Sequence, residues 1–258
     1  MPLEGKTVLI TGASRGLGRT LTQVFAEAGC RLALMSRSRD ELKETTAQAG
    51  LTSEDCLVWP GDVSQIDQAA GFVQAALERF SSLDILINNA AVIGPPQFLD
   101  HQSQADWSKT VDIDLKGPAC LCREALHAML SQSDGTVINL SSGLARMAFP
   151  RFNAYCVAKA GLEQMTRCLA EEFARSGVLF YCVDPGVMDT SMQREIRSLP
   201  SERITHELKR QFQQMKQEGH LRSPGETAEL ITALADHRPR NLNGRTVSLK
   251  DLPDIAGR

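Results

Sequence analysis

The chain has 258 residues, of which 42% are hydrophobic and 23% are charged, as is ordinary for a globular protein. Its formal net charge of −3 argues against a nucleic-acid partner, which usually needs a basic face. No apolar run approaches the roughly 18 residues that a membrane span requires. Residues 1–6 carry an acidic side chain and lead directly into a strand, so we expect no signal peptide.

Seven cysteines, an odd number, are scattered over the expected strands and helices. This usage is typical of reduced thiols in the cytoplasm, where we expect the protein to be located. Cys120 and Cys122 form the only close pair, and side chains two positions apart on a helix point to different faces. We therefore expect no metal site and interpret the cysteines as small core residues.

Short apolar runs alternate with segments of helical spacing along most of the chain. Strands are expected at residues 7–10, 31–35, 56–59, 83–87, 136–140, 178–183 and 246–249, and helices at residues 17–28, 39–49, 65–80, 112–132, 152–176 and 224–237. Strands separated by helices indicate parallel pairing with right-handed crossovers. We expect an α/β fold with a single Rossmann-type doubly wound sheet of about seven strands, ordered 3-2-1-4-5-6-7, within one domain over residues 1–258.

A glycine-rich segment, Thr11-Gly-Ala-Ser-Arg-Gly-Leu-Gly18, follows the first strand and opens the first helix. Glycines tolerate positive φ and let backbone amides approach a pyrophosphate, while the helix start adds free N–H groups and the positive dipole end. A structural turn is the alternative, but the position between strand and helix favours dinucleotide binding. The residues expected to contact the dinucleotide are Gly12, Ser14, Arg15, Gly16, Leu17 and Gly18.

The end of the second strand predicts which dinucleotide binds. An acidic residue there would bind the ribose 2′-hydroxyl of NAD. This chain has Ser36 and Arg37 instead, with Arg15 in the glycine loop, and no acidic side chain opposes them. Two guanidinium groups favour a 2′-phosphate and therefore NADP(H). The alternative is that Arg37 is a solvated surface charge.

Two further segments are expected at the same rim. Asp62, after the third strand, is placed to accept from the adenine amino group with Val63 against the ring; helix capping is its competing role, although Ser64 is the more obvious cap. Asn89 follows the fourth strand and is expected to contact the cofactor.

Ser142, Tyr155 and Lys159 are the candidate catalytic residues. Tyr155 and Lys159 are four residues apart on one helix and therefore share a face. A phenol titrates near pKa 10, and a neighbouring ammonium favours the phenolate and lowers that pKa. Ser142 directly follows the fifth strand and can hydrogen-bond a substrate carbonyl. Each residue alone has a structural explanation, as a core tyrosine, a surface lysine or a turn serine, but together they predict proton transfer to a carbonyl.

Residues 189–223 interrupt the alternation, because they are polar, charged and helix-prone and contain no expected strand. Ligands of open α/β sheets bind beyond the carboxyl ends of the strands. We therefore interpret this segment as a helical substrate lid.

The motifs, taken in order, resemble the short-chain dehydrogenase/reductase family over essentially the whole chain: the glycine segment 11–18, Asp62, Asn-Asn-Ala at 88–90, Ser142, Tyr155 with Lys159, and Pro185-Gly186. The resemblance implies that Pro185, Gly186, Val187 and Thr190 hold the carboxamide end of the nicotinamide. It also implies a homodimer or homotetramer that pairs through the helices at 112–132 and 152–176.

Two positions depart from the family pattern. Ala91 replaces the glycine that usually ends Asn-Asn-Ala-Gly, and its methyl group should only tighten packing. Asp114 replaces the asparagine that usually holds a water in the proton path to the lysine. An aspartate still accepts hydrogen bonds, but its charge opposes ionisation of Tyr155 unless burial protonates it. We expect Asp114 to keep a catalytic part in the relay, with an alkaline-shifted pH optimum.

Residues 184–193 and 216–224 are similar to the sepiapterin reductase and benzil reductase branch, which reduces vicinal dicarbonyl compounds with NADPH. That resemblance places Asp251 where sepiapterin reductases anchor the pterin, although it could equally be an exposed tail residue. The predicted function is NADPH-dependent reduction of a ketone or vicinal diketone, with Tyr155 as general acid. Two alternatives remain: an NADP-dependent alcohol or hydroxysteroid-type dehydrogenase, and a non-catalytic NADP-sensing protein.

Overall fold

The computed structural model describes residues 3–188, 210, 214 and 221–257. Its centre is a seven-stranded sheet in the order β3-β2-β1-β4-β5-β6-β7, in which every neighbouring pair is parallel. The strands are β1 (Thr7–Thr11), β2 (Arg31–Ser36), β3 (Cys56–Pro60), β4 (Ile85–Asn88), β5 (Gly135–Leu140), β6 (Val178–Asp184) and β7 (Thr246–Ser248). The Rossmann-type sheet and strand order expected from the sequence are confirmed.

The central strands are apolar throughout because both faces of the sheet are covered. Every residue of β1, β4 and β5 is buried. Alternate residues of β1 serve opposite faces: Val8 and Ile10 belong to one hydrophobic cluster and Leu9 to the other.

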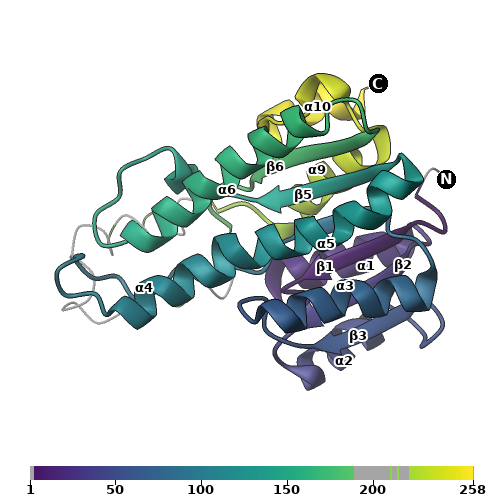
Figure 1. The fold of residues 1–258 in the computed structure, drawn as a ribbon, viewed down its shortest axis with the longest axis horizontal. Coiled ribbons are helices and arrows are strands. Elements are labelled where there is room, and N and C mark those ends of the chain that lie inside the picture. Colours follow the sequence, from purple (N-terminus) through teal and green to yellow (C-terminus); the bar gives the residue numbers. More distant parts are fainter. Residues whose placement is uncertain (1–2, 189–209, 211–213, 215–220, 258) are drawn as a thin grey trace.

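Helices form a layer on each side of the sheet (Figure 1). One layer holds α1 (Gly16–Glu27), α2 (Arg39–Gln48) and α9 (Pro224–His237), and the other holds α3 (Ile66–Phe80), α5 (Gly117–Gln132) and α6 (Asn153–Glu172). All crossovers connect parallel strands, so the carboxyl ends of all seven strands, and the loops that follow them, lie at one edge.

The long helix expected at residues 112–132 is different in the structure. It begins earlier, as α4 (Gln104–Val111), continues through a π-helical turn at Asp112–Lys116, and ends as α5. The amide of Gly117 bonds to the carbonyl of Asp112, and Pro118 directly follows and has no N–H to donate. Such turns are frequent at functional sites, and this one carries Asp114.

The structure also contains short helical elements that the sequence did not predict. A 3₁₀ turn at Gly143–Ala145 follows Ser142, and further turns at Arg240–Leu242 and Leu249–Asp251 precede α10 (Leu252–Ala256). Most of the expected lid, residues 189–223, lies outside the described residues. The single domain expected over residues 1–258 stays a prediction. The described ends of that segment meet, because Arg222 N donates to Val187 O at 2.8 Å.

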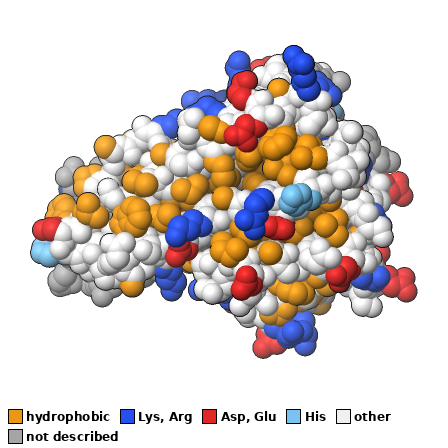
Figure 2. Space-filling model, viewed as in Figure 1, with side chains coloured by type: hydrophobic (Ala, Val, Ile, Leu, Met, Phe, Trp, Pro, Cys, Tyr) orange, Lys and Arg blue, Asp and Glu red, His pale blue; other side chains and the backbone are white. Residues whose placement is uncertain are grey.

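The face over α5 and α6 carries a band of hydrophobic side chains with interspersed charges (Figure 2). Leu130 of α5 and Val157 of α6 are exposed. Within the described ranges, none of the helices combines the length and apolar content that a membrane crossing needs.

All seven cysteines lie in the described ranges and are free. Five are buried, as core residues should be, Cys156 is half-buried and Cys168 is exposed. Burial raises the pKa of Cys30, Cys56 and Cys122 to about 12, which makes these thiols unreactive at neutral pH.

Candidate active site

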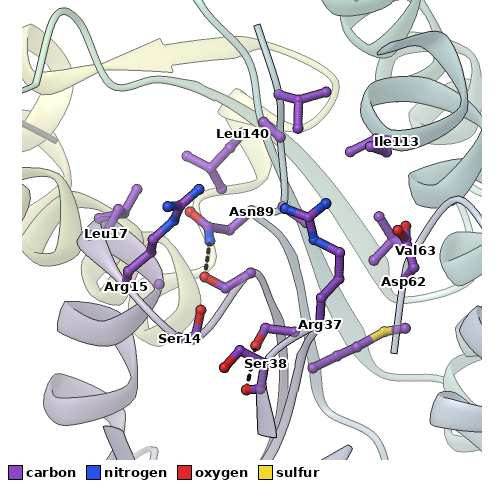
Figure 3. Close-up of a pocket in the computed structure, with 18 of the residues that line it drawn as sticks. Ser14, Arg15, Leu17, Arg37, Ser38, Asp62, Val63, Asn89, Ile113 and Leu140 are labelled. Atoms are coloured by element: carbon purple, nitrogen blue, oxygen red, sulfur yellow. Dashed lines mark hydrogen bonds between the residues drawn. The ribbon is translucent and has the colours of Figure 1, made fainter. Parts of the chain in front are cut away.

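A cavity of about 380 Å³ lies at the carboxyl edge of the sheet. The glycine loop, the loops after β2, β3 and β4, and the face of α6 contribute its walls. The expected site residues that line it are Gly12, Ser14, Arg15, Gly16, Leu17, Gly18, Ser36, Arg37, Asp62, Val63, Asn89, Tyr155, Lys159 and Pro185. Residues from segments far apart in sequence therefore meet in one cavity (Figure 3).

The glycine loop has a shape that side chains would destroy. Gly12 and Gly16 have φ of +65° and +52°, in the left-handed region. A Cβ on Gly18 would lie 2.1 Å from the carbonyl oxygen of Gly12. The close approach of strand, loop and helix leaves backbone exposed to the cavity, which fits a pyrophosphate.

Asn89 holds this loop in place. Its Nδ2 donates to Thr11 O at 2.8 Å and to Gly12 O at 3.2 Å, and its backbone N–H donates to Thr11 Oγ1 at 3.1 Å. The side chain therefore fixes the loop that borders the cavity, besides lining the cavity itself.

The first turn of α1 is left open for an anion. Its N-cap residue, Arg15, makes no side-chain capping bond, and the turn contains no acidic residue. The free N–H groups and the positive dipole end point to the cavity edge, an arrangement that binds phosphate groups.

The Arg15 and Arg37 side chains are exposed and reach into the cavity from different walls (Figure 3). Ser36 lies at the same end, where its hydroxyl donates to Ser38 O at 3.3 Å. The expectation that no acidic side chain opposes the arginines is wrong, because Glu41, in the first turn of α2, also lines this end. The cavity lining thus holds Arg15 and Arg37 together with two carboxylates, Glu41 and Asp62.

The loop after β3 presents Asp62 beside the buried Val63. The Asp62 carboxylate accepts from the backbone N–H of Ser64 at 2.9 Å and from its hydroxyl at 2.7 Å. Neither Asp62 nor Ser64 caps α3, whose N-cap residue is Gln65 without a side-chain bond. The capping role considered for Asp62 is therefore not observed, and its carboxylate fixes the loop.

Tyr155 and Lys159 lie one turn apart on α6, and both are buried. Lys159 Nζ lies 5.6 Å from the centroid of the Tyr155 ring and donates to Leu140 O at 2.9 Å. Ser142 is the second residue after β5 and the N-cap of the 3₁₀ turn, where its hydroxyl accepts from Leu144 N–H at 3.3 Å. The Ser142 side chain also forms a hydrogen bond with Tyr155. The three expected catalytic residues are therefore close together.

Asp114 approaches the same ammonium from the π-helical turn. It is completely buried, its Oδ2 lies 3.3 Å from Lys159 Nζ, and its Oδ1 accepts from Val92 N–H at 2.9 Å. Burial raises the pKa of Asp114, while Lys159 and the Val92 amide oppose the rise. Burial acts to lower the pKa of Lys159, but Asp114 and Tyr155 outweigh it and raise that pKa. The raised pKa of Lys159 favours its ammonium form.

The pKa of Tyr155 is raised, not lowered as the sequence suggested. Burial raises it most, and the Lys159 ammonium lowers it as expected but less strongly. Asp114 and Asp184 add to the rise, and the Ser142 bond opposes it. At neutral pH the phenol is neutral, which is the form that can donate a proton.

The sequence pattern of the short chain dehydrogenase family matches residues 6–200 of this chain, more than half of its length. The chain belongs to the short-chain dehydrogenase family. It is therefore an oxidoreductase of a family that uses NAD(P)(H). The sepiapterin and benzil reductase branch within the family stays a prediction.

Relatives span nearly the whole chain. Oxidoreductase UcpA of Salmonella typhimurium is 33% identical over 94% of this chain and 92% of its own. 3beta-Hydroxysteroid dehydrogenase 1 of Eggerthella lenta is 29% identical over 95% of this chain and 92% of its own. The crystal structure of levodione reductase superposes with a TM-score of 0.86 at 27% identity, covering 99% of each chain.

Some expected site residues of this short-chain dehydrogenase do not line the cavity. Ser142 and Asp114 are not lining residues, but Ser142 contacts Tyr155 and Asp114 contacts Lys159, both of which line the cavity. Gly186 and Val187 follow the lining residue Pro185 in the chain and do not line the cavity themselves. Thr190 lies outside the described residues. Asp251 is not a lining residue either; its carboxylate accepts from Ser248 N–H and hydroxyl at 2.8 and 3.1 Å in a capping box.

Other lining residues were not predicted. They are Met35, Ser38, Glu41, Gly61, Ala90, Ala91, Val92, Ile113, Leu140, Ser141 and Met188. Most are neighbours of predicted residues, so position at a strand end was their available signal. Glu41 and Ile113 come from helices, and only the packing of those helices against the sheet brings them to the cavity.

Proposed function

We propose that the chain is an NADP(H)-dependent reductase that converts a ketone or vicinal diketone to an alcohol. The observation that carries this proposal is one constellation. A buried neutral phenol, Tyr155, lies beside the Lys159 ammonium and the Ser142 hydroxyl, at the wall of the cavity that the glycine loop borders.

The chain's own residues do the proton chemistry. Tyr155 donates its hydroxyl proton to the carbonyl oxygen, which becomes the alcohol oxygen. Ser142 hydrogen-bonds the same oxygen and stabilises the negative charge that develops there. Lys159 holds its ammonium near the phenol and favours the tyrosinate that is left after transfer. The nicotinamide, when bound, supplies the hydride to the carbonyl carbon.

The selection of NADP(H) over NAD(H) rests on the charges at one end of the cavity. Arg15 and Arg37 are proposed to bind the 2′-phosphate with the help of the Ser36 hydroxyl. Glu41 offsets part of this positive charge, and we therefore expect a smaller preference for NADP(H) over NAD(H). Pro185, Gly186, Val187 and Thr190 are proposed to hold the nicotinamide carboxamide, and Asp62 with Val63 the adenine.

The opposite direction, oxidation of an alcohol, is the second candidate. A related protein named as a 3beta-hydroxysteroid dehydrogenase favours it, whereas the similarity to levodione reductase favours reduction. The raised pKa of Tyr155 supports reduction, because reduction needs the phenol and oxidation needs the phenolate.

We propose a cytoplasmic homodimer or homotetramer as the working form. The exposed apolar side chains over α5 and α6, among them Leu130 and Val157, support pairing through these helices (Figure 2). Sedimentation of Leu130→Glu and Val157→Glu variants tests this assembly.

The test of the function is consumption of NADPH and NADH against 1,2-diketones, pterins, quinones, aldehydes and ketosteroids. We expect turnover of at least one ketone or diketone, with a higher kcat/KM for NADPH. Oxidation of alcohols without reduction of any carbonyl would favour the dehydrogenase. Tight NADPH binding without turnover of any substrate would favour the sensor.

A further inference from the structure

A second charged cluster lies behind the reacting side chains. Arg146, just after the 3₁₀ turn that follows Ser142, donates to Glu163 Oε1 on α6 at 2.6 Å. The same guanidinium also donates to Asp184, the last residue of β6. One side chain therefore joins the loop after β5 to α6 and to the end of β6.

The backbone near this cluster belongs to the site. Ser141, which lines the cavity, donates its hydroxyl to Glu163 Oε1 at 2.9 Å. Asp184 Oδ1 accepts from Gly186 N–H at 3.1 Å, in the segment proposed to hold the carboxamide. A shift of Arg146 would therefore change both loops that border the nicotinamide end.

The charges in the cluster need the guanidinium. The Glu163 side chain is 4% exposed and that of Asp184 is 15% exposed, whereas Arg146 is 46% exposed. Two poorly solvated carboxylates thus share one cation that reaches them from the surface. Removing that cation leaves buried negative charge uncompensated.

Asp184 also acts on the reacting phenol. The charged and polar groups that face Tyr155 are Lys159 on its own helix, Asp114 on the π-helical turn, Ser142 after β5 and Asp184 at the end of β6. Asp184 raises the pKa of Tyr155. Its carboxylate is also near Gly143, the residue after Ser142, because a Cβ at Gly143 would lie 3.7 Å from Asp184 Oδ2.

We propose that Arg146 is a positioning residue, which fixes the Ser142 loop against the end of β6 and masks the Asp184 carboxylate beside the reacting groups. Arg146 does not line the cavity, so it acts through these neighbours. The proposal rests on the proposed function, because it assigns Arg146 to the same proton transfer.

The test is the pH profile of kcat/KM for carbonyl reduction by Arg146→Gln. Unmasking Asp184 raises the pKa of Tyr155, so the neutral phenol persists to higher pH. The alkaline limb is therefore expected to move up by about half a pH unit or more. The kcat is expected to fall about 10-fold through displacement of Ser142, with the KM for NADPH changed less than about 3-fold. Arg167→Gln, on the outer part of α6, is the matched control and should leave the profile unchanged.

A double variant separates charge from mere structure. In Arg146→Gln/Asp184→Asn the unmasked charge is gone, so the alkaline limb should return to within about 0.2 unit of its wild-type position. Arg146→Lys keeps the positive charge but loses the guanidinium group that bonds to Glu163 and Asp184 at the same time. It should therefore lower kcat without moving the alkaline limb of the pH profile. A wild-type profile for Arg146→Gln, an equal shift in the double variant, or an equal shift in Arg146→Lys would each overturn the proposal.

A second readout does not need turnover. The chain has two tyrosines, and burial raises the pKa of Tyr181 far above its usual range. Ring-carbon NMR of ¹³C-tyrosine-labelled protein with bound NADP⁺, assigned through Tyr155→Phe, therefore follows Tyr155 alone. The Arg146→Gln variant should titrate at higher pH than wild type even if no carbonyl substrate is found, and equal titration would contradict the proposal.

Discussion

At Tyr155, burial and the neighbouring Lys159 ammonium act in opposite directions on the pKa of the phenol. Burial raises its pKa, and Lys159, one turn away, lowers it by a smaller amount. Asp114 pairs with that ammonium and adds its own negative charge. The residue that departs from the family pattern thus sits where it can tune the proton donor.

Replacing Asp114 by Asn should lower the pKa of Tyr155, because the negative charge that opposes phenolate formation is removed. The neutral phenol then disappears at lower pH, so the alkaline limb of the reduction profile should move down by about one unit. The measurement is kcat/KM against pH. Asp112→Asn, in the same π-helical turn but paired with Lys116, is the control and should keep the wild-type profile. Identical profiles for Asp114→Asn and wild type would reject the charge argument.

The cofactor preference is tested at the second arginine of the cavity. Arg37→Gln should weaken NADPH binding about 10- to 100-fold, because a charge-assisted contact to the 2′-phosphate is lost. The Kd for NADH should change only a few-fold. Arg39→Gln removes a charge two residues away that does not line the cavity, and it should leave both Kd values unchanged. Equal weakening of NADPH and NADH by Arg37→Gln would contradict the assignment.

At the scale of elements, the junction of β1 and α1 depends on the absence of one methyl group. A Cβ on Gly18 would overlap the Gly12 carbonyl oxygen at 2.1 Å, so the loop in Gly18→Ala must move. We expect at least about a 100-fold loss of NADPH affinity by calorimetry, with the fold retained. Gly71→Ala in α3 is the matched control, because its Cβ would meet Trp59 at an ordinary 3.4 Å. That variant should bind NADPH normally and gain up to about 1 kcal/mol of stability.

The strands were the elements that the sequence predicted best. Central strands such as β4 are buried on both faces and therefore read as continuous apolar runs. The start of the long helix was missed, because a π-helical turn at residues 112–116 lets helical backbone continue through a stretch whose side-chain spacing changes. Glu41 was missed at the cavity because helix packing, rather than strand order, places it there.

The candidate site was predictable where sequence neighbours share an element. Tyr155 and Lys159 are one turn apart on a helix, so their proximity followed from the helical period alone. The net direction of the Tyr155 pKa did not, since burial decides it and burial depends on the whole fold. The contact of Arg146 with Asp184 likewise joins the loop after β5 to the end of β6, which only the sheet brings together.

At the scale of the whole molecule, stability and chemistry are separated along the strands. Arg238, at the C-terminus of α9, donates to Gly135 O and Gly177 O at 2.9 Å each, and to Thr136 Oγ1 at 3.1 Å. These bonds lie at the amino ends of β5 and β6, opposite the cavity.

Arg238→Ala should therefore destabilise the protein without changing its chemistry. We expect a loss of about 2–3 kcal/mol in the free energy of unfolding, because charge-assisted bonds to backbone carbonyls are removed. Denaturant titration measures the loss. The kcat/KM at a temperature well below Tm should stay within about 2-fold of wild type, and a large fall in kcat/KM would contradict this separation.

The central claim is that Tyr155 gives the proton to the carbonyl oxygen. A change to phenylalanine removes the hydroxyl group that carries this proton and keeps the aromatic ring. The most direct measurement is kcat/KM for NADPH-dependent reduction by Tyr155→Phe, beside the Kd for NADPH. Tyr181→Phe, which alters the chain's other tyrosine in the core, is the control. We predict that Tyr155→Phe binds NADPH within about 3-fold of wild type but loses about 10³-fold or more in kcat/KM, while Tyr181→Phe remains active. Reduction by Tyr155→Phe at a rate within about 10-fold of wild type would contradict the account.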